Sequence, residues 1–339
     1  MNIDIKEELR KLKEPVWKEY KKYLPLKEPE EHYRMVREYP ERQGKYLRPG
    51  LVMLSTDMHG GNPNDAILTA AAMQSSEDWL LIHDDFQDHS EERRHKPSLN
   101  VVYGDELSVN AGDALHLIMW KMLGDNVRKL GDNIGWKIYD KMYDILMKTS
   151  EGQYMEINWI VSRNMDVSEE EYFAMVDRKT CNYTITGPLQ LGAIVAGIDD
   201  ADEKIEAWGT PFGRGFQIWD DVMNLVSSTS EQGKERGGDI LEGKRTLILI
   251  HLLNNCSPIE NKQIRKIYSK NRIDKTVDEK DYVLKLMEEY GSIEYAAKIA
   301  KEYANKAKSV FEEYSSSLPG SRSKEIIKEL IDFVVSRKE

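Results

Sequence analysis

The 339-residue sequence predicts an all-α fold, and three observations support this prediction. Residues that favour helices, such as Glu, Lys, Met, Leu and Ala, are abundant along the whole chain. Apolar residues recur at intervals of three and four, the period of a helix with one buried face. No Asn-Gly or Asp-Gly dipeptide occurs, so the sequence does not offer a tight β-hairpin.

The helices of the first half can be placed from their caps and apolar stripes. Asn64 or Asp65 is expected to cap a helix that runs into Asp84. Two stripes then predict two long helices. They consist of Leu107, Ala111, Ala114, Leu115, Ile118, Met119 and Met122, and of Ile134, Ile138, Met142, Ile145, Leu146 and Thr149. Ser168 followed by three glutamates predicts another helix start, because acidic side chains stabilise the first turn.

The second half continues in the same way. Residues 200–203 open a stretch expected to end as a helix near Asn224, with a kink or restart at Pro211. The charged segment 278–314 predicts an amphipathic surface helix. Gly and Pro predict breaks at Gly60-Gly61-Asn62-Pro63, Lys96-Pro97, Gly187-Pro188, 233–238 and Pro319-Gly320.

Composition excludes several classes of function. The chain has 48 basic and 59 acidic residues and a net charge of −11, so it lacks the basic character of a nucleic-acid-binding protein. An anionic substrate would have to be held by local basic residues. Two cysteines build no disulfide framework, the N-terminal residues do not resemble a signal peptide, and no apolar run has the length of a membrane span. We therefore expect a cytoplasmic protein.

Two acidic clusters are the main candidates for chemistry. The first is residues 84–88, Asp-Asp-Phe-Gln-Asp, and the second is residues 220–224, Asp-Asp-Val-Met-Asn. On a helix, residues four apart share a face at roughly 6 Å, so the outer residues of each cluster stack. Oxygen ligands without His or Cys indicate Mg²⁺ rather than Zn²⁺. The alternative is two solvated helix faces. If both clusters bind one site, residues 1–339 must form a single domain.

Three basic segments accompany these clusters. Arg93 and Arg94 follow the first cluster, and a Gly-rich segment with Lys234 and Lys244 follows the second. Guanidinium groups and lysines are suited to phosphate, and glycines let the backbone approach it. Upstream, residues 43–49, Gln-Gly-Lys-Tyr-Leu-Arg-Pro, combine two basic residues with a helix start, where anions bind. The alternatives are a solvated charge run, a common flexible loop and a capped helix with surface charges.

The order of the motifs is more specific than any one of them. Gly-Lys-x-x-Arg-Pro precedes Asp-Asp-x-x-Asp with Arg-Arg, then Gly152-Gln153, Lys179-Thr180, Phe216-Gln217-x-x-Asp-Asp, and Gly-Asp-Ile-x-x-Gly-Lys-x-Thr. This order resembles the all-trans short-chain isoprenyl diphosphate synthases, of the geranylgeranyl and farnesyl diphosphate synthase type. The resemblance extends from about residue 40 to about residue 255.

The resemblance implies an isoprenoid synthase-type helical bundle around a deep central cavity, usually in a homodimer. Its members join isopentenyl diphosphate head-to-tail to an allylic diphosphate such as the dimethylallyl, geranyl or farnesyl compound. By this resemblance Asp84 and Asp88 would ligate two Mg²⁺ ions and Asp220 a third, with Asp221 in support.

The same resemblance implies two diphosphate sites. The allylic diphosphate would bind the metals together with Arg93, Lys179, Lys234 and Lys244. The isopentenyl diphosphate would bind, without metal, at Gly44, Lys45, Arg48 and Arg94. The Lys179 carbonyl, the Thr180 hydroxyl and the Gln217 amide oxygen would steady the allylic cation. The departing diphosphate would take the proton, so no side-chain base is needed.

Three positions depart from the family pattern. Asn224 stands where the family commonly has Asp, and it lacks the charge. Glu77 stands where His or Gln is usual near isopentenyl diphosphate, and an acid there would repel that anion unless it is protonated, paired or turned away. His95 replaces the usual Gly after the paired arginines.

Product length in the family is set by residues one to two turns before the first aspartate, here Ser76, Trp79 and Leu80. Trp79 would lie about 7 Å along the helix from Asp84. A bulky ring at that depth predicts a C20 product, geranylgeranyl diphosphate, with C15 as the alternative. If Trp79 turns aside, the product would lengthen. The alternative is that Trp79 is an ordinary core residue.

Two other functions fit parts of the pattern. A class I terpene cyclase also uses an aspartate-rich motif and Mg²⁺, but Lys45, Arg48 and Arg94 would then have no role. A non-catalytic prenyltransferase subunit usually loses one aspartate motif, whereas this chain keeps both. The order of motifs therefore favours an active prenyltransferase.

Overall fold

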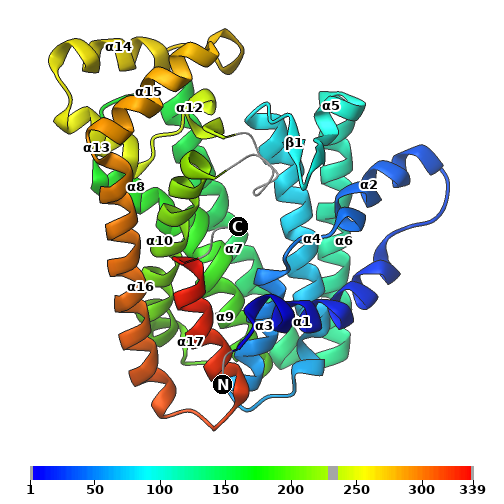
Figure 1. The fold of residues 1–339 in the computed structure, drawn as a ribbon. Helices are drawn as coiled ribbons and strands as arrows, with labels where there is room; N and C mark the ends of the chain where they lie inside the picture. The colour runs from blue at the N-terminus through cyan, green and yellow to red at the C-terminus, as the bar shows by residue number, and fades with distance from the viewer. Residues whose placement is uncertain (1–2, 228–235, 337–339) are drawn as a thin grey trace.

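The computed structural model describes residues 3–227 and 236–336, and this part of the chain is almost wholly helical (Figure 1). The α-helices of the first half are α1 (Ile5–Tyr20), α2 (Glu30–Arg42), α3 (Leu47–Met58), α4 (Pro63–Gln87), α5 (Leu99–Tyr103), α6 (Asp105–Leu130), α7 (Asp132–Val161) and α8 (Glu169–Val176). Those of the second half are α9 (Gly187–Val195), α10 (Asp202–Val226), α12 (Gly238–Glu242), α13 (Leu247–Asn255), α14 (Pro258–Tyr268), α15 (Val277–Glu289), α16 (Ser292–Ser316) and α17 (Arg322–Val334). The all-α prediction is confirmed. None of the described helices is long and apolar enough to cross a membrane.

The bundle has two halves, which lie side by side in Figure 1. In one half α4 packs along α6, and in the other α10 packs along α16. Between them α7 contacts α6 on one side and the helical segment 177–186 on the other, and that segment also contacts α10. The helices that bear the two acidic clusters, α4 and α10, thus belong to opposite halves.

Apolar contacts join the two ends of the chain. One buried cluster contains Leu54 of α3, Trp208 and Phe212 of α10, Phe311 of α16 and Ile327 of α17. Accordingly α17 packs against α3 and also contacts α1. We propose that residues 1–339 form a single domain, because a division would cut through this cluster.

The predicted helix starts are correct to within a few residues. The cap of α4 is Asn62, whose side-chain oxygen accepts a hydrogen bond from the backbone of Asn64 at 3.1 Å, so the prediction of Asn64 or Asp65 is wrong by two or three residues. The reason is Pro63, which suits the first helical position and places the cap before it. At α8, Ser168 is the cap as predicted, and it forms a capping box with Glu171.

The sequence predicts a break at Gly187-Pro188, but the chain does not break there. Between α8 and α9 it forms a π-helix, Asp177–Thr186, so that one helical path continues from residue 169 to residue 195. In the π-helix the backbone N–H of Gly187 bonds to the carbonyl of Asn182, five residues earlier. This stretch matters for function because it bears Lys179 and Thr180.

Two further boundaries differ from the predictions. α10 continues through Pro211 as one helix, with no restart there. The segment expected as a single surface helix is two helices, α15 and α16, separated at Gly291, whose φ is +63°. Nor is α16 only a surface helix, because Ala300 and Ala304 are buried where it packs along α10.

A two-residue hairpin contradicts the prediction that no tight hairpin occurs. Strands β1 (Glu92–Arg93) and β2 (Lys96–Pro97) pair antiparallel, and Arg94 and His95 form the turn. Their φ angles are +54° and +61°, a conformation for which hairpins prefer Asn-Gly. Tertiary contacts replace this local preference, since Arg94 Nη1 bonds to the Tyr39 carbonyl at 2.7 Å.

His95 occupies this left-handed position with an exposed side chain. Glycine adopts that conformation without strain, which explains the family preference for glycine stated above. Replacing His95 with Gly should raise the free energy of unfolding by about 1 kcal/mol, because the left-handed conformation costs a side chain ~1–2 kcal/mol and no buried contact is lost. Chemical denaturation measures the change. Lys96→Gly, one residue later in β2, is the control and should lower stability. No gain from His95→Gly would contradict the strain argument.

Candidate active site

A cavity of about 510 Å³ lies between α4, α7, the π-helix and α10. Its polar lining includes Arg48, Glu77, His83, Asp84, Gln87, Thr149, Ser150, Gln153, Lys179, Thr180, Thr184, Gln217 and Asp220. Its apolar and aromatic lining includes Trp79, Leu80, Leu81, Leu146, Tyr154, Ile157, Tyr183 and Phe216. One cavity therefore exposes carboxylates of both acidic clusters together with a long apolar wall.

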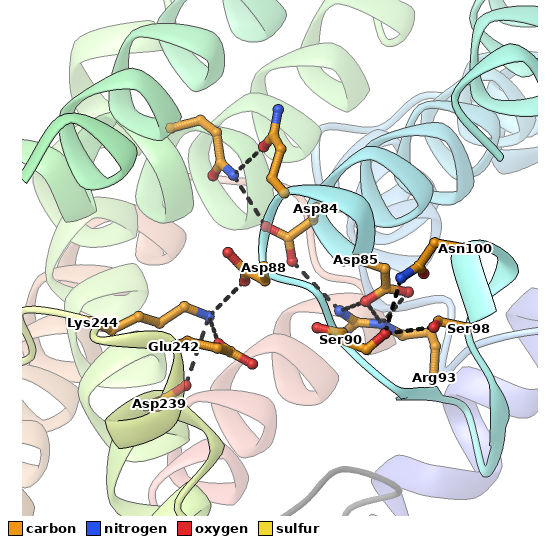
Figure 2. Close-up of polar contacts among 12 residues, drawn as sticks. Asp84, Asp85, Asp88, Ser90, Arg93, Ser98, Asn100, Asp239, Glu242 and Lys244 are labelled. Atoms are coloured by element: carbon orange, nitrogen blue, oxygen red, sulfur yellow. Dashed lines mark hydrogen bonds and ion pairs between the residues drawn. The ribbon is translucent and has the colours of Figure 1, made fainter. Parts of the chain in front are cut away.

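The three aspartates of the first cluster point in different directions (Figure 2). Asp84 lines the cavity, and its Oδ1 accepts a hydrogen bond from Gln153 at 3.2 Å. Asp85 is buried and turns to the hairpin, where Arg93 Nε donates to it at 2.9 Å. The Tyr39 hydroxyl also donates to Asp85, at 2.5 Å. Asp85 therefore fixes the hairpin.

Asp88 belongs to a second charged group, centred on the partly buried amine of Lys244 (Figure 2). Lys244 Nζ lies 3.1 Å from Asp88, 3.7 Å from Asp239 and 2.7 Å from Glu242. Burial raises the pKa of Asp88 to about 7, although Lys244 opposes this shift. Because Asp239 and Glu242 lie on α12, Lys244 connects that helix to the end of α4.

The second acidic cluster divides in a similar way. Asp220 lines the cavity. Asp221 is buried, which raises its pKa, and it accepts hydrogen bonds from Gln217 Nε2 at 2.8 Å and the Tyr172 hydroxyl at 2.9 Å. The side chain of Asn224 accepts a hydrogen bond from the backbone of Asp239 at 3.2 Å. Asn224 thus supports the start of α12, a role that an amide fills without charge.

The π-helix adds a lysine and a threonine to the cavity wall. Lys179 Nζ forms an ion pair with Glu156 and lies 3.9 Å from Asp84 Oδ1. The Thr180 hydroxyl donates to the Gln217 amide oxygen at 2.6 Å. Thr180 and Gln217, the two side chains predicted to stabilise the allylic cation, therefore contact each other directly between the π-helix and α10.

A second group of basic residues, Arg48 and Arg94, pairs with carboxylates of α4. Arg48 Nη1 is 3.0 Å from Glu77 Oε2, and its Nη2 donates to Thr184 at 2.9 Å. Arg94 Nη1 is 2.9 Å from buried Asp78, and its Nη2 is 3.5 Å from Glu77 Oε1. A Cβ on Gly44 would lie 3.0 Å from Arg94 Nη2, so glycine leaves room for the guanidinium.

Comparison with known proteins identifies the family. The polyprenyl synthetase family model matches residues 29–287. The chain belongs to the polyprenyl synthetase family. It is 31% identical to the geranylgeranyl diphosphate synthase of Sulfolobus acidocaldarius over 87% of this chain and 88% of that protein. It is 32% identical to the short chain isoprenyl diphosphate synthase of Methanothermobacter thermautotrophicus over 87% of both.

Solved structures agree. The geranylgeranyl pyrophosphate synthetase of Pyrococcus horikoshii matches with a TM-score of 0.84 and 29% identity, and the match covers 98% of each chain. The family prediction made from the order of the motifs is confirmed, and this polyprenyl synthetase is a prenyltransferase.

Not every predicted site residue faces the cavity of this polyprenyl synthetase. Arg93 is bound by Asp85 and lies 3.5 Å from Asp84, but it does not line the cavity. Lys45 is exposed. Lys234 lies outside the described residues. Lys244 is enclosed by carboxylates, as described above.

Of the three residues predicted to set product length, Trp79 and Leu80 line the cavity. Ser76 does not, because it is buried and its hydroxyl bonds to the Met73 carbonyl at 2.7 Å. The ring of Trp79 stacks on His116 of α6 with 4.1 Å between ring centroids. Sequence reasoning missed His116, which lies on a different helix, outside the apolar residues that predict that helix, and belongs to no motif.

The donor chemistry of the clusters suits Mg²⁺, because Asp84 and Asp220 direct carboxylates to one cavity from opposite halves of the bundle. Among the described residues, no group of three or more His, Cys, Asp or Glu side chains is already arranged to hold a metal ion. Lys244 instead balances the charge of Asp88, and Lys179 approaches Asp84.

Gly152 fixes the position of Lys179. A Cβ on Gly152 would lie 2.5 Å from the Lys179 backbone nitrogen, so α7 and the π-helix must separate to admit it. Gly152→Ala should lower the free energy of unfolding by ~1–3 kcal/mol and reduce turnover. Thermal unfolding and a steady-state assay measure both. Gly124→Ala is the control, since nothing lies within 4 Å of its Cβ and alanine favours helices; an equal loss there would contradict the packing argument.

Proposed function

We propose that this protein condenses isopentenyl diphosphate head-to-tail (1′-4) with an allylic diphosphate to give geranylgeranyl diphosphate. The observation that supports this most is one cavity lined by Asp84 and Asp220, by Lys179, and by a long apolar wall. Such a cavity suits a molecule with an anionic head and a growing hydrocarbon tail. Relatives named geranylgeranyl diphosphate synthase support the C20 product.

Each group of site residues has a separate proposed role. Asp84, Asp88 and Asp220 would hold three Mg²⁺ ions, which would neutralise the allylic diphosphate as a leaving group. Lys179 adds positive charge beside it. Phe216 and the leucines of the wall exclude water, which would otherwise quench an allylic cation.

Polar oxygens near the apolar wall would stabilise that cation. The Thr180 hydroxyl and the Gln217 amide line the cavity and bond to each other, so their oxygens are held in place. The Lys179 carbonyl, also in the π-helix, is the third oxygen that we assign to this role. Arg48 and Arg94 would hold the diphosphate of the acceptor, isopentenyl diphosphate.

Incubation of the purified protein with Mg²⁺, isopentenyl diphosphate and each allylic diphosphate tests this function. We expect a C20 prenyl diphosphate from chromatography of the products. A C15 product would make the protein a farnesyl diphosphate synthase, a hydrocarbon would indicate a cyclase, and no turnover would indicate a non-catalytic subunit.

We also infer a homodimer, because α6 and α7 expose many large apolar side chains. These are Leu107, Leu117, Trp136, Tyr143, Met147, Tyr154 and Val161. Light scattering should give twice the 39.2 kDa of the chain, and a monomer at micromolar concentration would contradict this inference.

A further inference from the structure

The acceptor-site arginines are already neutralised by carboxylates of this chain. Arg48 and Arg94 contribute two positive charges, and Glu77 and Asp78 contribute two negative charges within ion-pair distance of them. The side chain of Glu77 is only 12% exposed, so solvent screens these contacts little. An incoming diphosphate therefore meets a site with no net positive charge among these four groups.

The two carboxylates are not equivalent. Asp78 is buried behind Arg94, accepts a hydrogen bond from Gln74 at 3.3 Å, and does not line the cavity. Glu77 lines the cavity and bridges both arginines, with 3.0 Å to Arg48 and 3.5 Å to Arg94. Asp78 therefore pairs with Arg94 alone, while Glu77 pairs with both arginines, of which Arg48 lines the cavity.

We propose that Glu77 is a specificity-determining residue that occupies the acceptor arginines as an internal anion and must be displaced by the diphosphate of isopentenyl diphosphate. The inference rests on the proposed function. It predicts that Glu77 weakens binding of the acceptor and not of the allylic substrate, because Asp84 lies seven residues further along α4, or about 10 Å.

Direct binding tests the proposal without turnover. The full chain is titrated calorimetrically with isopentenyl diphosphate in a chelator, so that only the metal-free site is populated. Glu77→Gln keeps the shape of the side chain and removes its charge, and we expect the Kd to fall at least tenfold. Asp65→Asn makes the same change of charge at an exposed position at the start of α4 and should leave the Kd unchanged.

A second substitution separates loss of competition from gain of a new contact. Glu77→Ala also removes the charge but cannot hydrogen-bond to the diphosphate, and it should tighten binding as well. If only the Gln variant gains affinity, the gain comes from a new hydrogen bond and the proposal is wrong. Arg48→Gln in the Glu77→Gln background should abolish most of the gain.

Steady-state kinetics add an independent readout. In Glu77→Gln the KM for isopentenyl diphosphate should fall about as much as the Kd, while the KM for the allylic diphosphate stays constant. Equal Kd values for wild type and both Glu77 variants would overturn this inference and leave the proposed function intact. No binding to any variant, together with no turnover, would overturn both.

Discussion

Asp84→Asn should lower kcat by on the order of 10²–10³-fold and leave the fold intact. Asp84 lines the cavity. Its Oδ1 accepts a hydrogen bond from the Gln153 amide at 3.2 Å and lies 3.9 Å from Lys179 Nζ. Asn keeps the shape and can still accept the hydrogen bond from Gln153, but it removes the charge that a Mg²⁺ ligand supplies. Turnover at saturating substrate, compared with the circular dichroism and melting temperature of the same sample, measures both effects.

The same charge change elsewhere on α4 provides the control. Asp65→Asn lies at the opposite end of the helix with an exposed side chain, and it should retain wild-type turnover. Asp220→Asn, from the other half of the bundle, should match Asp84→Asn. Turnover near the wild-type value in both Asp84→Asn and Asp220→Asn would show that these carboxylates do not bind the catalytic metals.

Trp79→Ala should shift the product from C20 to longer chains. The indole lines the cavity, is stacked on His116 at 4.1 Å, and donates a hydrogen bond to His83 at 3.2 Å. Its loss would open space along the apolar wall, where the growing tail has to lie. Chromatography of the dephosphorylated products, with each allylic diphosphate as primer, measures the shift.

The conservative variant separates bulk from hydrogen bonding. Trp79→Phe keeps an aromatic ring of smaller volume and loses the N–H donor to His83, and its product should remain C20 if the ring itself limits the chain. If Trp79→Ala still stops at C20, Trp79 does not limit the chain. Stability must be measured in parallel, because removal of a buried tryptophan costs ~3–5 kcal/mol and this partly buried ring should cost less.

Local sequence patterns predicted most helices and both acidic clusters. The periodicity of α6 and α7 and the cap of α8 depend on neighbours within a few residues, and the structure agrees there. The π-helix has no such signal, because its wide turn depends on how α7 and α10 pack around it. The hairpin was missed for a similar reason: Tyr39 and Asp78, which fix Arg94, belong to other elements.

The same distinction holds in the site. Motif spacing predicted Asp84, Asp220 and Lys179 as site residues, since each lies within a short pattern on one helix, and all three line the cavity. It could not identify Asp78 or His116, which act on Arg94 and Trp79 through contacts between separate elements. The sequence analysis gave three alternatives for Glu77: protonated, paired or turned away. Motif spacing could not show that Glu77 is paired, because its partners Arg94 and Arg48 lie 17 and 29 residues away.

The hairpin connects the two regions proposed to bind the substrates. Arg93 is the last residue of β1 and pairs with Asp85 in the first acidic cluster, whereas Arg94, the first residue of the turn, pairs with Glu77 and Asp78. A single peptide bond thus joins a residue that contacts the first acidic cluster to a residue of the proposed acceptor site. If a ligand bound beside one guanidinium displaced the hairpin backbone, it would also displace the other guanidinium.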